Sequence, residues 1–211
     1  VNNIERTASL FLVKNIFSFL LSLVSIIFVF TYPLGPSQIS LISMFTIGIP
    51  GFFLSLQPNK NVIKGHFLQN VLLKALPAGL TDVLVVAALA IFSQNFGVGG
   101  EDLSTAATML LAIVGFMILF KICKPLNPLR LAICIGCIIG FLASCILFPG
   151  LFGISSMSTK CVMLFVVFSI ATEPILRYLT KLNEWIQKLY GNRGLYKTRL
   201  LSMKEALRQG E

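Results

Sequence analysis

The chain has 211 residues, of which 56% are hydrophobic and only 12% are charged; its mean hydropathy is +0.88 and its net charge is +9. A soluble domain usually carries about 25% charged residues, and no compact soluble fold of this size buries so much apolar side chain. The composition therefore excludes a soluble enzyme, a nucleic-acid-binding domain and a disordered tail, and it predicts a protein whose solvent is mainly lipid.

Six apolar runs are long enough to cross a bilayer, which takes about 20 residues of helix. In chain order they are residues 8–30, 39–56, 72–92, 105–120, 129–147 and 161–178. Turn-forming and charged residues separate them. Exposed backbone cannot be satisfied in hydrocarbon, so these runs should be helices rather than open strands. The predicted fold is all-α, a polytopic bundle of six transmembrane helices over residues 1–179.

The basic residues predict the orientation of this bundle. With both termini in the cytoplasm, 15 of the 17 Lys and Arg residues lie on the cytoplasmic side. Only Lys160 falls outside, and the outer loop between the third and fourth spans carries Glu101 and Asp102 instead. This bias is the orientation signal of a multi-pass protein of the plasma membrane, and it does not indicate binding to nucleic acid.

Residues 180–211 differ from the spans and form a basic tail. Leu182, Trp185, Ile186 and Leu189 recur in it at helical spacing among lysines. Such a stretch suits a helix that lies along the cytoplasmic interface. A solvated flank of positive charge is the alternative interpretation.

The first span carries three polar candidates for an ion path. An ionisable residue inside a span is costly, and so it is a functional candidate by default. Lys14 is either a built-in cation at an ion site or a side chain that snorkels back to the interface. Asn15 and Ser18 offer amide and hydroxyl oxygens, which serve either an ion or a bond between helices.

The second span is the most informative. Pro50 has no amide donor, so it frees carbonyl groups near Thr46, and Gly48 loosens the same turn. A locally unwound helix that presents carbonyls beside the hydroxyls of Ser43 and Thr46 is one way in which membrane proteins hold cations. A simple proline kink is the alternative.

Two acidic residues are secondary candidates. Asp82 lies in the third span after Pro77, and it serves either helix packing or the ion path. Glu173 lies near the cytoplasmic end of the sixth span, where Arg177 is four residues away and faces the same side of a helix, so a simple ion pair is the alternative to a functional role.

Metal-binding and catalytic side chains are scarce. Five cysteines lie inside or beside apolar runs, where they are expected to be buried, reduced packing residues. Cys134 and Cys137 have the spacing of half a zinc site, but no second pair of ligands accompanies them. His66 is the only histidine. No metal site is therefore assigned, and no catalytic residue.

Several of these residues together resemble the C-terminal membrane half of the P-type cation-transporting ATPases. The resemblance rests on Asn2-Asn3-Ile4 before the first span, on Thr46-x-Gly48-x-Pro50 and on Gln57-Pro58. In the calcium pumps of that family, the fifth membrane helix follows a similar Asn-Asn, and the sixth reads roughly Asn-Leu-x-Thr-Asp-x-x-Pro-Ala. The resemblance implies that this chain supplies helices five to ten of a ten-helix transport domain.

The same pattern suggests roles for individual residues. Thr46 and Pro50 match the Thr and Pro of the sixth helix, Ser43 takes the Asn position, and Asn15 falls on the ion-binding Asn of the fifth helix. Lys14 lies where a fixed ammonium competes with a cation in some proton-linked pumps.

The chain also departs from the family pattern at the ion site. Ile47 and Ser18 stand where the calcium pumps carry carboxylates. Calcium strongly prefers carboxylate oxygen, so the usual two-calcium site cannot be assembled from this half alone. A single site completed by the fourth helix is still compatible with the sequence.

The resemblance implies partners outside this chain. The sequence has no Asp-Lys-Thr-Gly-Thr phosphorylation motif and begins without Met, so we expect it to be a piece of a longer protein and unable to hydrolyse ATP alone. ATP and Mg²⁺ would bind the cytoplasmic domains of that protein. The expected partners are the lipid bilayer, helices one to four of the same polypeptide and a transported cation, with calcium first and magnesium or manganese next.

Two other functions fit the six spans. One is an independent six-helix transporter or channel subunit, and the other is a purely structural membrane anchor. A phosphorylation motif in the polypeptide before Val1 would favour the pump.

Overall fold

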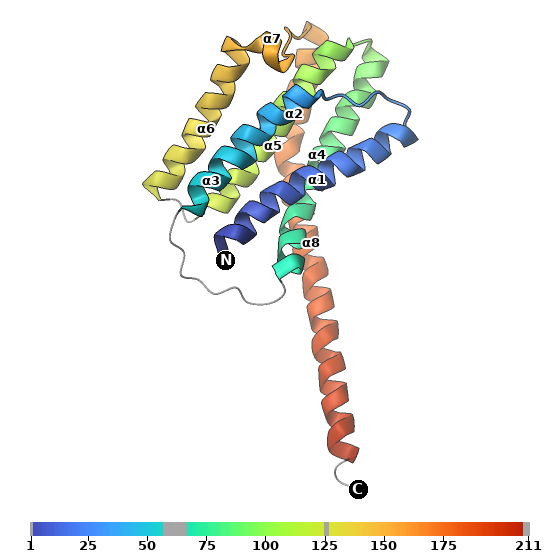
Figure 1. The fold of residues 1–211 in the computed structure, drawn as a ribbon. Helices are drawn as coiled ribbons and strands as arrows, with labels where there is room; N and C mark the ends of the chain where they lie inside the picture. The colour runs from blue at the N-terminus through green and yellow to red at the C-terminus, as the bar shows by residue number, and fades with distance from the viewer. Residues whose placement is uncertain (1, 57–66, 125–126, 209–211) are drawn as a thin grey trace.

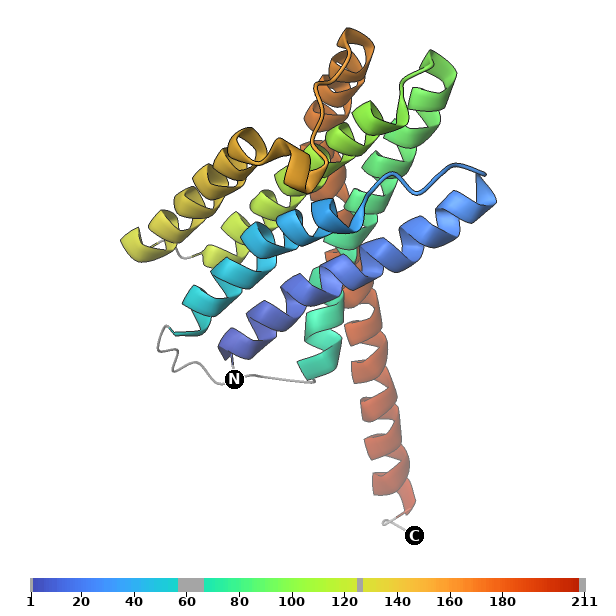
Figure 2. The same ribbon diagram turned by 45° about the horizontal axis from the view of Figure 1, so that its top comes forward.

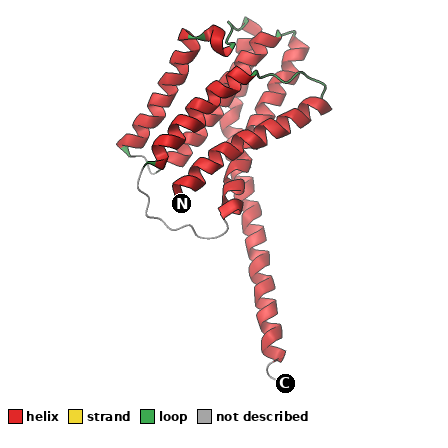
Figure 3. Cartoon of the chain, viewed as in Figure 1, coloured by secondary structure: helices red, strands yellow, loops and turns green. Residues whose placement is uncertain are grey.

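The computed structural model describes residues 2–56, 67–124 and 127–208, with side chains described for residues 8–56, 71–73, 75–124 and 127–188. All regular structure in these ranges is helical, and Figure 3 shows no strand in them. The predicted all-α class is therefore confirmed. Gln57-Pro58, His66 and residues 209–211 of the tail lie outside the described residues.

Nine helical segments follow one another along the described chain. They are α1 (Asn2–Ile27), α2 (Pro36–Ser43), the π-helical turn η1 (Met44–Gly48), α3 (Ile49–Ser55), α4 (Phe67–Phe96), α5 (Gly100–Cys123), α6 (Pro128–Leu147), α7 (Pro149–Phe152) and α8 (Thr159–Arg208). Six stretches are long and apolar enough to cross a membrane, namely Ala8–Ile27, Pro36–Ser55, Val71–Phe96, Gly100–Cys123, Pro128–Leu147 and Thr159–Lys188. The prediction of six spans is confirmed, although the third, fourth and sixth are longer than predicted.

The helices run back and forth between two ends of the bundle (Figures 1 and 2). The N-terminus, the end of α3 and the start of α4 lie at the same end as the turn from α5 to α6. Lys121 and Lys124 are at this end, whereas Glu101 and Asp102 begin α5 at the other. At that other end, Asp102 Oδ2 accepts a hydrogen bond from the backbone N–H of Ser158 at 2.9 Å. The charges therefore segregate as the orientation signal requires.

Helix α4 is the most buried of the six spans, and α1, α5 and α8 pack against it. In its span 67% of the most apolar stretch is buried, against 11% for α8 and 22% for α1. Helix α1 crosses it closely at Gly79, where an added Cβ would lie 2.7 Å from Ile16 Cγ2. The outer faces carry exposed apolar side chains such as Phe19, Ile139 and Ile170, as expected for surfaces that contact lipid.

A side chain of α8 replaces the hydrogen bond that is lost at the proline inside α4. Pro77 has no N–H, so the carbonyl of Leu73, four residues earlier, loses its helical donor. The side-chain amide of Asn183 on α8 donates to this carbonyl at 2.6 Å. This hydrogen bond joins α8 to α4 and satisfies an acceptor that the proline left open.

Replacing Asn183 by leucine should therefore destabilise the bundle by about 1–3 kcal/mol, because the Leu73 carbonyl would be left without a donor. The measurement is thermal unfolding of the purified protein in detergent. Asn95→Leu is the control, because the exposed Asn95 amide donates at 3.2 Å to a carbonyl in a proline-free turn of the same helix. Equal shifts in the two variants would contradict this role of Asn183.

Helix α8 passes from the sixth span into the basic tail without interruption (Figure 1). It runs from Thr159 to Arg208 and extends well beyond the rest of the bundle. The sequence left open whether the tail is a helix along the interface or a solvated flank; the described backbone continues the helix of the span to Arg208.

Candidate functional site

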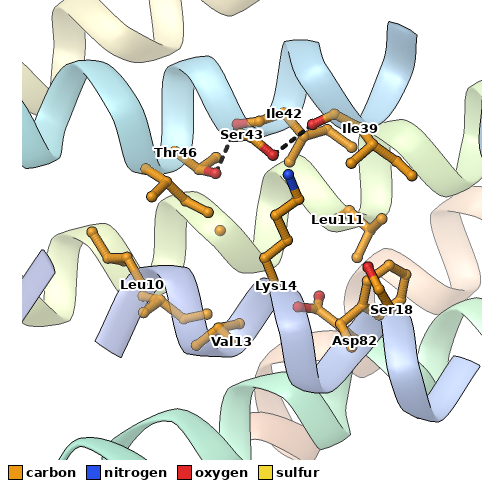
Figure 4. A pocket seen from close by; sticks show the side chains of 14 residues that line it. Leu10, Val13, Lys14, Ser18, Ile39, Ile42, Ser43, Thr46, Asp82 and Leu111 are labelled. Atoms are coloured by element: carbon orange, nitrogen blue, oxygen red, sulfur yellow. Dashed lines mark hydrogen bonds between the residues drawn. The ribbon is translucent and has the colours of Figure 1, made fainter. Parts of the chain in front are cut away.

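A cavity of about 50 Å³ lies between α1, the α2–η1 segment, α4 and α5 (Figure 4). About 10–15 Å³ suffices for one water molecule, so the cavity has room for a small cation with some water. Its lining residues are Leu10, Val13, Lys14, Phe17, Ser18, Ile39, Ile42, Ser43, Thr46, Ile47, Asp82, Leu111, Gly115 and Ile118. Most of this lining is apolar, so its few polar atoms act at low dielectric.

The helix that forms one wall changes its geometry at this cavity. The N–H of Ile49 donates to the carbonyl of Met44, five residues earlier, and η1 is therefore π-helical. Pro50 follows directly and has no N–H for the carbonyl of Thr46. We expected local unwinding here; the structure has a wider helical turn, a feature that is frequent at functional sites. The turn places Thr46 and Ile47 in the interior.

Two hydroxyl groups on this wall have their protons engaged. Ser43 Oγ donates to the carbonyl of Ile39 at 2.6 Å, and Thr46 Oγ1 donates to the carbonyl of Ile42 at 2.7 Å. Figure 4 shows both bonds at the edge of the cavity. A hydroxyl that donates its proton still has lone pairs, so both oxygens can accept a hydrogen bond or coordinate a cation.

The position of Thr46 depends on a glycine in the facing helix. A Cβ at Gly115 of α5 would lie 2.7 Å from Thr46 Cγ2 and 3.0 Å from Thr46 Cβ. Only glycine therefore permits this approach of α5 to η1 without displacement. Gly115 was not among the residues predicted from the sequence; the available signal was a glycine within an otherwise apolar span.

Two opposite charges, Lys14 and Asp82, line the same cavity. Lys14 is half-buried, and its ammonium points across the cavity toward Ser43 (Figure 4). Asp82 is 5% exposed, and its Oδ1 has no hydrogen-bond partner among the described residues. Within the described part of the chain the two side chains form no ion pair. A buried carboxylate without a partner is costly, which makes it a candidate for a functional role.

The other predicted residues of the first two spans occupy different places. Ser18 lines the cavity. Pro50 is buried but does not line the cavity; it acts on the backbone next to it. Asn15 is exposed on the outer face of α1, and the structure does not bring it to this cavity.

Glu173 lies away from the cavity. Its carboxylate forms an ion pair with Arg177, four residues later on α8, and both side chains are exposed. This is the pair that their helical spacing suggested.

A second cavity, of about 450 Å³, lies between α1, α4, α5 and α8. Lys121, Asn183 and Glu184 are among its lining residues, but none of the predicted ion-path residues is. In the described residues no three His, Cys, Asp or Glu side chains are grouped to hold a metal ion. All five cysteines are buried and free, as predicted.

Comparison with known proteins gives the family. The chain is 33% identical over 167 residues to the probable cation-transporting ATPase exp7 of Streptococcus pneumoniae, a match that covers 75% of this chain and 21% of that protein. It is 33% identical over 147 residues to the calcium-transporting ATPase CtpE of Mycobacterium bovis, covering 63% of the chain and 18% of the relative. For CtpE of Mycolicibacterium smegmatis the identity is 34% over 143 residues, covering 59% and 18%.

No family model and no solved structure matches the chain. The chain spans about a fifth of the length of the curated relatives that it matches. Its six membrane-crossing helices are the kind of segment that such integral proteins of the plasma membrane contain. The chain therefore belongs to the bacterial P-type cation-transporting ATPases, of which it is a membrane-spanning portion.

Proposed function

We propose that this chain forms helices five to ten of an ATP-driven cation pump and that the cavity between α1, η1, α4 and α5 is part of the ion path. ATP and Mg²⁺ bind cytoplasmic domains of the longer polypeptide, and helices one to four complete the transport domain. Movement of α1 under strain from those domains would open the cavity to one side and then to the other.

One observation carries this proposal: oxygen atoms and both kinds of charge converge on a single interior cavity beside a π-helical turn. Ser18, Ser43, Thr46 and Asp82 supply the oxygens, and Lys14 supplies the positive charge. A structural anchor needs no such group, and a buried polar atom without a hydrogen-bond partner, such as Asp82 Oδ1, lowers its stability.

The outer face of α1 supports the presence of further helices. Asn15 is exposed between Phe11 and Phe19, one turn away on either side, which are 53% and 69% exposed. A side-chain amide within a bilayer needs a hydrogen-bond partner, and another helix of the same polypeptide would provide it. The amide would then lie at the boundary between this chain and the fourth helix.

The charges in the cavity bear on which ion is carried. Asp82 and Lys14 together have no net charge, so a divalent cation would leave two uncompensated positive charges at low dielectric. We therefore propose that calcium, the ion in the name of the CtpE relatives, takes additional carboxylate oxygen from the fourth helix. Magnesium and manganese are the next candidates.

The test is ATP hydrolysis by the complete polypeptide in lipid vesicles, measured against free Ca²⁺, Mn²⁺ and Mg²⁺. We expect stimulation by calcium at the lowest concentration, together with uptake of the same ion into the vesicles. Hydrolysis that none of the three cations stimulates would overturn the proposed function.

In that assay Thr46→Ala should raise the half-saturating cation concentration at least tenfold, because a polar contact to a charged group is worth about 1.5–3 kcal/mol and about 1.4 kcal/mol is tenfold in affinity. Thr108→Ala is a matched control. Thr108 is also buried and donates to the carbonyl four residues earlier, at 2.8 Å, but it does not line the cavity.

Asn15→Ala should shift the same concentration if Asn15 meets the ion at the boundary with the fourth helix. Unchanged cation dependence in both Thr46→Ala and Asn15→Ala would place the ion site elsewhere.

A further inference from the structure

The carboxylate of Asp82 is the polar group that the packing of the bundle leaves unexplained. It comes from α4 and not from the two helices to which the resemblance assigns the ion ligands. Only 5% of Asp82 is exposed, and its Oδ1 has no hydrogen-bond partner among the described residues. The neighbouring Thr81, by contrast, is satisfied by the carbonyl of Pro77 at 2.7 Å.

The surroundings of Asp82 match what a cation requires. The cavity also exposes Ser18 of α1 and the hydroxyls of Ser43 and Thr46, whose protons are already donated to carbonyls. Figure 4 shows the carboxylate on the α1 and α4 side of the cavity, near Ser18, with the two hydroxyls on the facing wall. A cation between these walls would meet one charged and several neutral oxygens.

We propose that Asp82 is the cation-binding carboxylate of this cavity. It takes over the function of the carboxylates that are absent at Ser18 and Ile47, so the ion is held nearer α4 than the pattern of the resemblance implies. This assignment rests on the proposed function, because it needs a transported cation.

Lys14 completes the charge balance of this site. Its stem starts near Asp82, and its ammonium is directed toward the α2 wall (Figure 4). In this position the ammonium leaves the carboxylate open to a cation. The long, flexible side chain can also reach a carboxylate that lines the same small cavity, and it would then neutralise Asp82 when no cation is bound.

The experiment uses the complete polypeptide in vesicles with Ca²⁺, Mn²⁺ and Mg²⁺ as probes. Asp82→Asn keeps the shape and removes the charge, and we expect it to raise the half-saturating cation concentration by at least tenfold. Asp82→Glu keeps the charge but moves it, and we expect it to retain stimulation with altered ratios among the three cations. The half-saturating concentration does not depend on how much protein is folded.

Ser93→Ala is the matched control, because Ser93 is a buried residue of the same helix whose hydroxyl lacks a partner in the described structure, and it does not line the cavity. It should leave the cation dependence unchanged.

If the unaltered protein is stimulated but Asp82→Asn and Asp82→Glu both keep its cation dependence, the assignment of Asp82 is overturned while the proposed function stands. If Asp82→Asn does not accumulate, unaltered cation ratios in Asp82→Glu overturn the assignment by themselves. If none of the three cations stimulates ATP hydrolysis by the unaltered protein, the proposed function itself is overturned.

Discussion

Replacing Lys14 by methionine should lower the half-saturating cation concentration of the complete pump about 100-fold. Methionine fills a similar volume but removes the positive charge from a small cavity that also holds Asp82. A unit positive charge and a divalent cation about 6 Å apart repel by about 5–6 kcal/mol at an effective dielectric constant of about 20, so removing about half of this repulsion already corresponds to about 100-fold in affinity. The measurement is cation-stimulated ATP hydrolysis in vesicles across a range of calcium concentrations.

Lys160→Met is the control for this experiment. Lys160 is exposed at the start of α8, at the opposite end of the bundle from the N-terminus, and it does not line the cavity. Removing its charge should leave the cation dependence unaltered. A silent Lys14→Met variant would mean that the ammonium leaves the cavity in the working pump, as the snorkelling interpretation holds.

Replacing Gly115 by alanine should both destabilise the bundle and weaken cation binding. The new Cβ would lie 2.7 Å from Thr46 Cγ2, and Thr46 has little freedom because it is β-branched and bonded to the Ile42 carbonyl. Overpacking of this kind costs about 1–3 kcal/mol. Displacement of the Thr46 hydroxyl should also raise the half-saturating cation concentration. Thermal unfolding in detergent and the vesicle assay measure the two effects.

A second substitution separates this contact from general damage to α5. Thr46→Ser removes the Cγ2 atom but keeps the hydroxyl, so it should restore stability and cation binding in the Gly115→Ala background. Gly136→Ala is the control, because a Cβ there meets nothing within 4 Å. Equal destabilisation by Gly115→Ala and Gly136→Ala, or no rescue by Thr46→Ser, would contradict the role of this close approach.

The spans and the site were predictable from the sequence to different degrees. The six spans follow from hydropathy, and Pro50 marked the place where the second span departs from regular α-helix. The form of that departure did not follow, because a proline removes one hydrogen bond without determining which wider or looser turn replaces it. A π-helical turn keeps neighbouring backbone groups bonded inside the bilayer, where unwound backbone would lack partners.

Lys14 and Asn15 show why the site needed the structure. They are adjacent in the sequence and were both candidates, yet Lys14 lines the cavity and Asn15 faces outward. Successive residues of an α-helix point about 100° apart, so the rotation of α1 about its axis decides which of them meets the interior. That rotation is set by packing against α4 at Gly79, a contact between distant parts of the chain.

The sequence by itself determined the class of protein, the number of spans and the resemblance to cation pumps, and it predicts the orientation of the spans. These properties depend on local composition, on the length of each apolar run and on charges at its ends. Only the tertiary structure decided which residues share one cavity, namely Lys14, Ser18, Ser43, Thr46 and Asp82. It also decided that Gly115 lies against Thr46 in the wall of this cavity. Which side chains meet between helices depends on the rotation and close packing of four helices together, and no single segment of sequence contains that information.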